Sequence, residues 1–95
     1  MTKVTFDIST LELRAEGHAG SGEVCCAVST LMFTLAQALD EYGIDAVGEG
    51  EEGGDYLSIR SEETGSLATV IYGTVFAGMQ MIAEKYPEYI KLEIR

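Results

Sequence analysis

Two long segments with helical spacing of apolar residues, each set between short alternating segments, constrain the fold of this chain most strongly. The first runs from Glu23 to Tyr42 and the second from Leu67 to Tyr86. Gly43 favours an end to the first helix, and Pro87 prevents the second from continuing. Apolar residues that recur every three or four positions predict a helix with one buried stripe. Those residues are Val24, Ala27, Val28, Leu31, Leu35, Ala38 and Leu39 in the first helix, and Leu67, Val70, Ile71, Phe76, Met79, Ile82 and Ala83 in the second.

Five shorter segments alternate between apolar and polar residues, which is typical of half-buried strands. They are Val4–Ile8, Leu11–Glu16, Ile44–Val47, Tyr56–Arg60 and Tyr89–Ile94, with Tyr56, Leu57 and Ile59 as the core residues of the fourth and Ser58 and Arg60 outward. Turns are expected at Ser9-Thr10, Gly48–Gly54 and Ser61–Gly65. We therefore expect one α+β domain over residues 1–95, a two-layer ββαββαβ fold. Its two helices cover one face of a five-stranded, largely antiparallel or mixed sheet.

The charge of the chain excludes several classes of partner. Sixteen acidic and six basic residues give a formal net charge of −10 over 95 residues. A nucleic-acid binder needs lysine and arginine to displace counterions from phosphates, and anionic membrane surfaces are disfavoured for the same reason. No stretch approaches the ~18 uninterrupted apolar residues of a transmembrane helix, and we expect no signal peptide in the first residues. Nine of the acidic residues lie between Asp40 and Glu63, where a solvated acidic face is the simplest interpretation.

The two cysteines, Cys25 and Cys26, are adjacent, and a disulfide between neighbours would be badly strained. Free thiols in a reducing compartment are the simpler interpretation, so we expect a cytoplasmic protein. One histidine and one cysteine pair supply too few ligands for a tetrahedral zinc site. We expect neither a metal nor another cofactor.

The stretch from Gly17 to Ser29 is the richest in chemistry. It places the only histidine, His18, in a loop with Gly17, Gly20 and Gly22, and it places Cys25 in the first turn of the following helix. Free backbone N–H groups at a helix N-terminus favour the thiolate of a cysteine there and can stabilise a developing oxyanion. An imidazole within reach could carry the proton, and glycines allow a substrate backbone to approach.

These residues alone leave alternatives open. Helical phase places Cys25 with Val28 and Ser29, and Cys26 with Ser29 and Thr30, which does not decide between the two thiols. A surface histidine beside a core cysteine is the structural alternative. An anion-binding loop is a further one, although the loop lacks the Gly-Lys-Ser/Thr ending of a P-loop.

The triplet Gly17-His18-Ala19, the loop after it and the Val-Cys-Cys-Ala-Val-Ser run over 24–29 resemble the signature of the Prp family of ribosomal-processing cysteine proteases. The resemblance extends over the whole chain, including the Tyr-Pro-Glu-Tyr-Ile-Lys ending at 86–91. It implies that Cys25 is the nucleophile and His18 the general base. Ser29, one turn after Cys25, would support the site by a hydrogen bond. Gly17 and Ala19 belong to the matching triplet, and the loop glycines Gly20 and Gly22 would let a substrate backbone approach closely.

The same resemblance implies a substrate and an assembly. Members of the family resemble one another in two ways. They remove an N-terminal extension from ribosomal protein bL27 or process a related phage structural protein, and they form homodimers. A helix marked by Gly73 and Gly78 agrees with close approach of a strand or partner helix. Lysine-rich ribosomal tails would be attracted by the acidic surplus.

Two departures from the family pattern concern the loop. It is shorter than in the family, and Gly22 stands where an aspartate is usual, three residues before Cys25, with Glu23 as its nearest substitute. The shorter loop motivates an alternative function, a non-catalytic peptide-binding or assembly module on the same scaffold.

Overall fold

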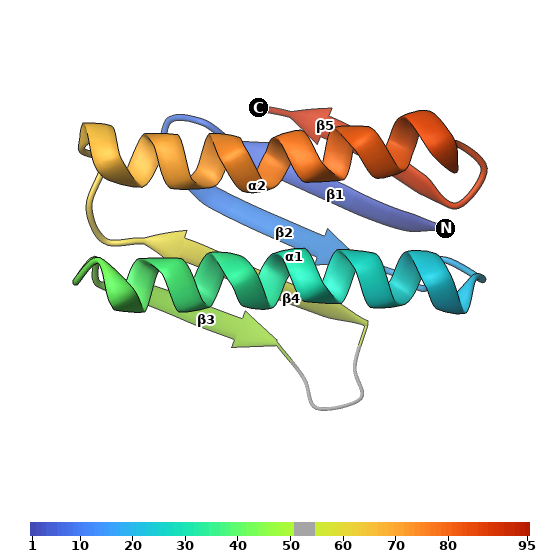
Figure 1. Ribbon diagram of the computed structural model, residues 1–95, viewed down its shortest axis with the longest axis horizontal. Coiled ribbons are helices and arrows are strands. Elements are labelled where there is room, and N and C mark those ends of the chain that lie inside the picture. Colours follow the sequence, from blue (N-terminus) through green and yellow to red (C-terminus); the bar gives the residue numbers. More distant parts are fainter. Residues whose placement is uncertain (51–54) are drawn as a thin grey trace.

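A computed structural model of the chain, which describes residues 1–50 and 55–95, confirms the expected two-layer α+β fold. The elements follow one another as ββαββαβ. In Figure 1 the two helices run side by side in opposite directions across one face of a twisted sheet. The element bounds are β1 Thr2–Asp7, β2 Glu12–Glu16, α1 Gly22–Glu41, β3 Ala46–Gly50, β4 Tyr56–Ser61, α2 Ser66–Lys85 and β5 Ile90–Ile94.

The sheet is mixed, with the strand order β3-β4-β2-β1-β5. The β1–β5 pairing is parallel, and the β1–β2, β2–β4 and β3–β4 pairings are antiparallel. The β1–β2 turn is held by Asp7, whose Oδ1 accepts hydrogen bonds from the Ser9 hydroxyl (2.8 Å) and the backbone N–H groups of Ser9 and Thr10. These bonds hold the pKa of Asp7 below its usual value, the Ser9 hydroxyl being the largest cause. The predicted hairpin is therefore present.

The core lies between the helices and the sheet, and its α2 stripe differs from the prediction. Leu67 and Val70 were expected inside but are exposed. The α2 residues that are buried are Ala68, Ile71, Tyr72, Val75, Phe76 and Met79. Tyr72 fixes this phase, because its ring stacks on Phe6 and its hydroxyl donates to the Ile59 carbonyl (3.0 Å). Burial is the main cause that raises the pKa of Tyr72.

The prediction for β4 was wrong at Tyr56, whereas the outward direction of Ser58 agrees with it. Ile59 of β4 is buried in the core, whereas Tyr56 lies on the opposite face under the Arg14 guanidinium, whose Cζ is 4.4 Å from the ring centroid. Ser58 faces away from the helices but is buried, and its hydroxyl donates to Glu12 Oε2 (3.0 Å). The helix-free face of the sheet is therefore covered by polar and charged side chains.

Strand β3 lies further along the chain than the predicted Ile44–Val47. Ile44 is buried before the strand begins, and Gly48 to Gly50 extend the pairing with β4. Backbone hydrogen bonds define this edge strand. A pattern of apolar side chains therefore does not predict that its glycines belong to the strand. The rest of the expected Gly48–Gly54 turn, 51–54, lies outside the described residues.

Candidate active site

The loop between β2 and α1 is shaped by Gly17. Its φ is +84°, and a Cβ there would lie 2.6 Å from the carbonyl oxygen of Met1, so only glycine fits. The Gly17 N–H donates to the Asp55 carbonyl (2.6 Å), and its carbonyl accepts from the Thr2 hydroxyl (3.4 Å). Two residues on, Ala19 is buried in the core. The loop is thus anchored on both sides of His18, whose side chain is exposed.

Ser21 fixes the start of α1. It is the N-cap: its hydroxyl accepts from the Val24 N–H (3.4 Å), and its carbonyl accepts from the Cys25 N–H (3.0 Å). These bonds place Cys25 in the first turn, as expected. They also occupy the N–H groups of Val24 and Cys25, so an oxyanion would need other donors.

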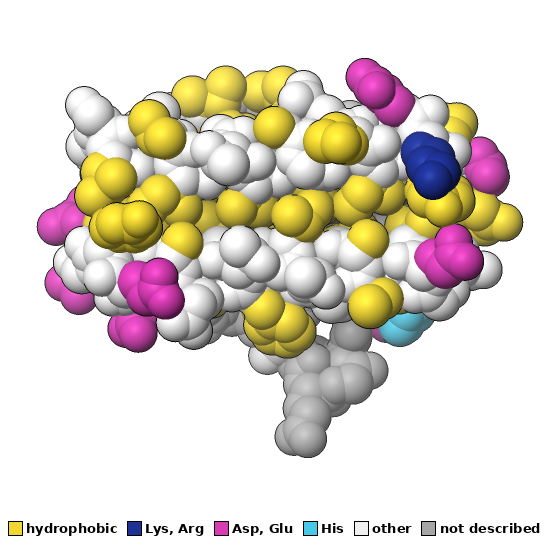
Figure 2. All heavy atoms as spheres, viewed as in Figure 1, with side chains coloured by type: hydrophobic (Ala, Val, Ile, Leu, Met, Phe, Trp, Pro, Cys, Tyr) yellow, Lys and Arg dark blue, Asp and Glu magenta, His cyan; other side chains and the backbone are white. Residues whose placement is uncertain are grey.

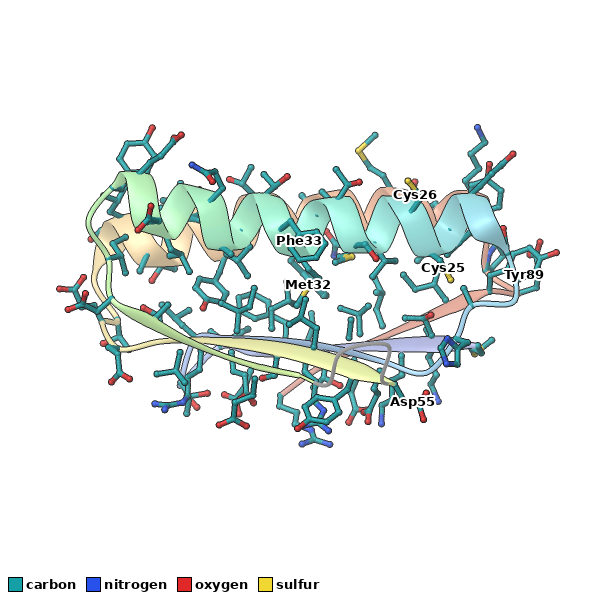
Figure 3. The ribbon with its side chains drawn as sticks, turned by 90° about the horizontal axis from the view of Figure 1, so that it is seen from below. Cys25, Cys26, Met32, Phe33, Asp55 and Tyr89 are labelled. Atoms are coloured by element: carbon teal, nitrogen blue, oxygen red, sulfur yellow. The ribbon has the colours of Figure 1, made fainter. Side chains whose placement is uncertain are left out.

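The two thiols point in different directions. Figure 3 shows Cys25 directed from α1 toward the sheet and Cys26 directed away from it. Cys25 is partly buried, whereas Cys26 is exposed. Of the two thiols, only that of Cys25 therefore points toward the space between α1 and the sheet.

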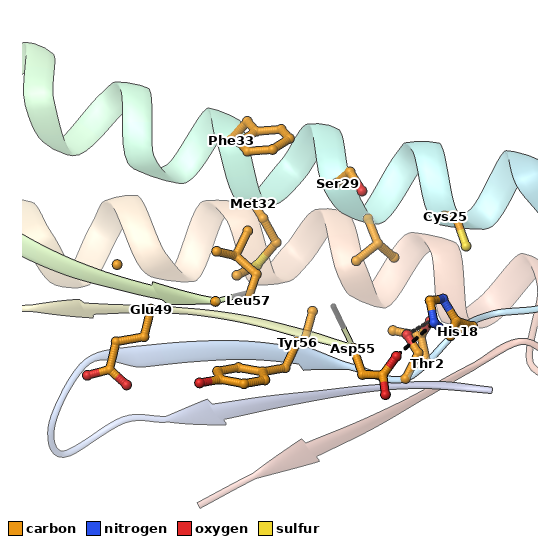
Figure 4. A pocket seen from close by; sticks show the side chains of 15 residues that line it. Thr2, His18, Cys25, Ser29, Met32, Phe33, Glu49, Asp55, Tyr56 and Leu57 are labelled. Carbon is orange, nitrogen blue, oxygen red and sulfur yellow. Dashed lines mark hydrogen bonds and ion pairs between the residues drawn. The ribbon is translucent and has the colours of Figure 1, made fainter. Parts of the chain in front are cut away.

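Cys25 and His18 open onto one cavity of about 600 Å³ between α1, the β2–α1 loop and the ends of β3 and β4. Val28, Met32 and Leu57 contribute apolar walls. Figure 4 shows the side chains that line this cavity. Its described lining residues are Thr2, Ala15, Gly17, His18, Cys25, Val28, Ser29, Met32, Phe33, Gly48, Glu49, Gly50, Asp55, Tyr56 and Leu57.

Some of the other predicted site residues line the cavity and others do not. Gly17 and Ser29 line it, and Ala19, Gly20 and Gly22 do not. Among the described residues, no hydrogen bond links the Ser29 hydroxyl to Cys25 or His18, and none links the Cys25 thiol to the His18 ring. Catalytic hydrogen bonds are often unformed without substrate, so this geometry does not argue against a Cys-His pair.

Asp55 is the site residue that sequence reasoning missed. Its Oδ1 lies 2.8 Å from Nε2 of His18, the interaction drawn as a dashed line in Figure 4. A sequence signal is absent, because Asp55 follows an acidic glycine-rich stretch and is 37 residues from His18. The contact depends on the register of β2 against β4.

Glu23 is directed elsewhere. Its Oε2 accepts a hydrogen bond from the Tyr86 hydroxyl (3.1 Å) at the end of α2. Glu23 thus does not replace the aspartate that is usual in the family at the position of Gly22. Its charge in the first turn of α1 also disfavours the alternative anion site at this helix start.

The cavity is acidic. Glu49 and Asp55, two of the nine clustered acids, line it, and no lysine or arginine does among the described residues. Within the same described part of the chain, no group of three or more His, Cys, Asp or Glu side chains is placed to hold a metal ion. The chemistry that this arrangement offers is that of a thiol and an imidazole.

A family model described as cysteine protease Prp matches residues 1–91. The chain belongs to this family. The expected membership is thereby confirmed, and with it a cysteine protease fold over nearly the whole chain. No curated protein sequence matches the chain.

Solved structures agree with the Prp family assignment. The ribosomal processing protease Prp of Staphylococcus aureus, crystallised with a covalently linked product peptide, superposes with a TM-score of 0.91 at 25% identity, and the match covers 100% of both chains. The same protease with a substrate peptide gives a TM-score of 0.90 at 24% identity, again over 100% of both chains. A Streptococcus mutans protein, SMU.848, is 26% identical with a TM-score of 0.79, covering 98% of this chain and 90% of that one.

Proposed function

We propose that this Prp family member is an endopeptidase in which Cys25 is the nucleophile and His18 the general base and acid. The observation that carries the proposal is the direction of the Cys25 side chain into the cavity that His18 also lines. A similar chain, the ribosomal processing protease Prp of Staphylococcus aureus, was crystallised with a covalently linked product peptide, which supports a peptide substrate.

The proposed reaction has two halves. Cys25 Sγ attacks the carbonyl carbon of the scissile peptide bond while the thiol proton passes to His18. The C–N bond then breaks, His18 returns the proton to the leaving amine, and a thioester remains on Cys25. Water attacks the thioester, a proton passes through His18 back to the sulfur, and the product with the new carboxyl terminus leaves.

The proposed substrate is the N-terminal extension of ribosomal protein bL27 or of a related phage structural protein. Its support is the family membership and the ribosomal processing function of the Staphylococcus aureus relative. The acidic lining from Glu49 and Asp55 suits a substrate with basic residues beside the cleavage site. We place the activity in the cytoplasm, since both cysteines are free thiols.

The test is cleavage of a peptide that spans the extension and the first residues of mature bL27. Wild-type protein and Cys26→Ala should cleave it, whereas Cys25→Ala and His18→Ala should lose at least about a thousandfold in kcat/KM. Cys26→Ala is the matched control, because it removes the neighbouring thiol that faces away from the sheet. Cleavage by Cys25→Ala at the wild-type rate would refute the proposal.

The shorter loop motivates an alternative function, a non-catalytic peptide-binding module. The same peptide distinguishes this alternative from the endopeptidase. Binding of the intact peptide by wild-type protein without any product over many hours would favour the module. Product formation that needs Cys25 would exclude it.

We also propose that two copies form a homodimer through the outer face of the helix layer. No charged residue occurs between Val24 and Leu39 or between Ser66 and Ala83, although the chain carries a net charge of −10. Val70 and Met81 of α2 are exposed. Figure 2 shows acidic side chains near the ends of this face and an uncharged centre. Two such faces can meet without like-charge repulsion.

The composition of both helices supports this interface. Each reaches a mean hydropathy of 1.4 over eighteen residues, enough by length and composition to span a membrane, and only 28% of each window is buried within the chain. Most residues of both helices are therefore not fully buried within the chain. Gly78 is filled from within the chain by Leu31, whereas no atom lies within 4 Å of a Cβ placed on Gly73, which remains open for a partner.

A further inference from the structure

We infer that Asp55 is a positioning residue for His18, holding the imidazole so that its second nitrogen serves Cys25. The inference rests on the proposed Cys25–His18 mechanism and names a third residue for it. Asp55 Oδ1 is 2.8 Å from His18 Nε2. Two observations support this role: the backbone position of Asp55 and the contact of its side chain with His18.

The backbone level fixes where Asp55 lies. The β2–β4 ladder ends with the pair Glu16 and Tyr56, and the next residue on each strand continues it through the 2.6 Å bond from the Gly17 N–H to the Asp55 carbonyl. The residue just before His18 is thus bound to Asp55. Because both partners extend a regular ladder, the two side chains are held on neighbouring backbone positions.

The side-chain level fixes the proton on the imidazole. An ionised carboxylate only accepts hydrogen bonds, so the Nε2–H of His18 must be the donor. The neutral ring then has Nδ1 as its acceptor nitrogen. In Figure 4 the His18 ring lies between the side chains of Asp55 and Cys25, which suits Nδ1 as the acceptor of the thiol proton. When the ring takes that proton, the carboxylate stabilises the imidazolium.

Other acidic groups near the site do not make this contact. Glu23 binds Tyr86, and Glu49 lines the cavity without a hydrogen bond to His18 among the described residues. Asp55 is therefore the carboxylate that acts on the ring in the described structure.

The exposure of the pair makes the inference testable without loss of the fold. The side chains of His18 and Asp55 are 72% and 79% exposed, so the contact between them contributes little to stability. The backbone bond from Gly17 survives any substitution of the Asp55 side chain. We therefore expect Asp55 variants to fold and to change reactivity.

The experiment measures alkylation of Cys25 by iodoacetamide at pH 7, with Cys26→Ala in every protein so that one thiol reports. His18→Ala should slow alkylation at least about tenfold, and Asp55→Ala should slow it about fivefold to tenfold. Asp55→Asn, which keeps an acceptor oxygen, should lie between Asp55→Ala and the parent. Asp45→Ala, which removes an exposed carboxylate outside the cavity, should match the parent.

The double variant decides whether Asp55 acts through His18. Asp55→Ala added to His18→Ala should have no further effect, because the group through which it acts is already gone. Parent-like alkylation by Asp55→Ala, or an equal loss in both backgrounds, would overturn the inference.

Failure of the proposed function gives a different result. If His18→Ala alkylates like the parent, the Cys25–His18 mechanism itself is wrong. If His18→Ala is slow and Asp55→Ala is not, only the role of Asp55 is wrong. In peptide cleavage in 0.5 M salt, where the charge of the acidic lining contributes little to substrate binding, the inference predicts that Asp55→Ala lowers kcat with KM within about twofold.

Discussion

Gly17 and Asp55 are joined by a 2.6 Å backbone hydrogen bond that continues the β2–β4 ladder by one step into the site. This bond connects the loop that carries His18 with the strand end that carries its carboxylate partner. The sheet, through its register, thereby brings together residues far apart in the sequence.

Gly17→Ala should destabilise the fold by about 2–4 kcal/mol, because φ is +84° and the new Cβ would lie 2.6 Å from the Met1 carbonyl oxygen. Gly20→Ala is the matched control: φ is +79°, but no atom lies within 4 Å of its Cβ position. It should cost only about 1–2 kcal/mol. Urea unfolding measures both, and equal losses would show that the contact with Met1 does not matter.

Val70→Glu should convert the proposed dimer to a monomer, since it places a carboxylate in the uncharged helix face of each copy. Light scattering should give twice the 10.3-kDa chain mass for wild type and that mass for the variant. Ile8→Glu, at an exposed position in the β1–β2 turn, should stay dimeric. A monomeric wild type at tens of micromolar would contradict the interface.

Asp7→Asn should lower stability near neutral pH and lose its effect in acid. The pKa of Asp7 in the folded chain lies below the usual value of 3.8, chiefly through the Ser9 hydroxyl. The stabilisation is therefore fully present above about pH 4 and disappears as pH falls through the lower folded value. The difference in unfolding free energy between wild type and variant should therefore stay constant from pH 7 to about pH 5 and shrink as the pH falls below about 4. Ser9→Ala should make the difference smaller, and a difference independent of pH would contradict this account.

Glu49→Gln should raise KM for a lysine-containing substrate peptide about twofold to fivefold at low ionic strength, with little change in kcat, because Glu49 borders the cavity. The effect should shrink in 0.5 M salt, where screening shortens the range of charge interactions. Glu84→Gln, exposed on α2 and outside the described lining, should leave KM unchanged. An unchanged KM for Glu49→Gln would show that the acidic lining does not select basic substrates.

The features of the fold that depend on the local pattern of apolar and polar residues could be predicted from the sequence. Helical periodicity locates both helices to within a residue or two, and the cap residues of α1 place Cys25 in its first turn. The exposed Leu67 and Val70 show the limit of periodicity: α2 is uncharged all round over most of its length, so more than one stripe has the right spacing. Packing of Tyr72 on the sheet chooses between them.

Asp55 could not be predicted for a different reason. Its contact with His18 spans 37 residues and depends on strand register, which a single sequence does not specify at this acidic glycine-rich turn. In contrast, the direction of Cys25 follows from helix geometry once the sheet is placed beneath α1. Residues set by long-range pairing are those that sequence reasoning missed.

The most direct test of the central claim uses a peptide chloromethyl ketone that carries the sequence before the bL27 cleavage site. Sulfur attack displaces chloride and leaves a thioether whose position tandem mass spectrometry identifies. We predict one adduct per chain, on Cys25 and not on Cys26, formed much more slowly in His18→Ala. An adduct on Cys26, or equal labelling of both cysteines independent of His18, would contradict the account.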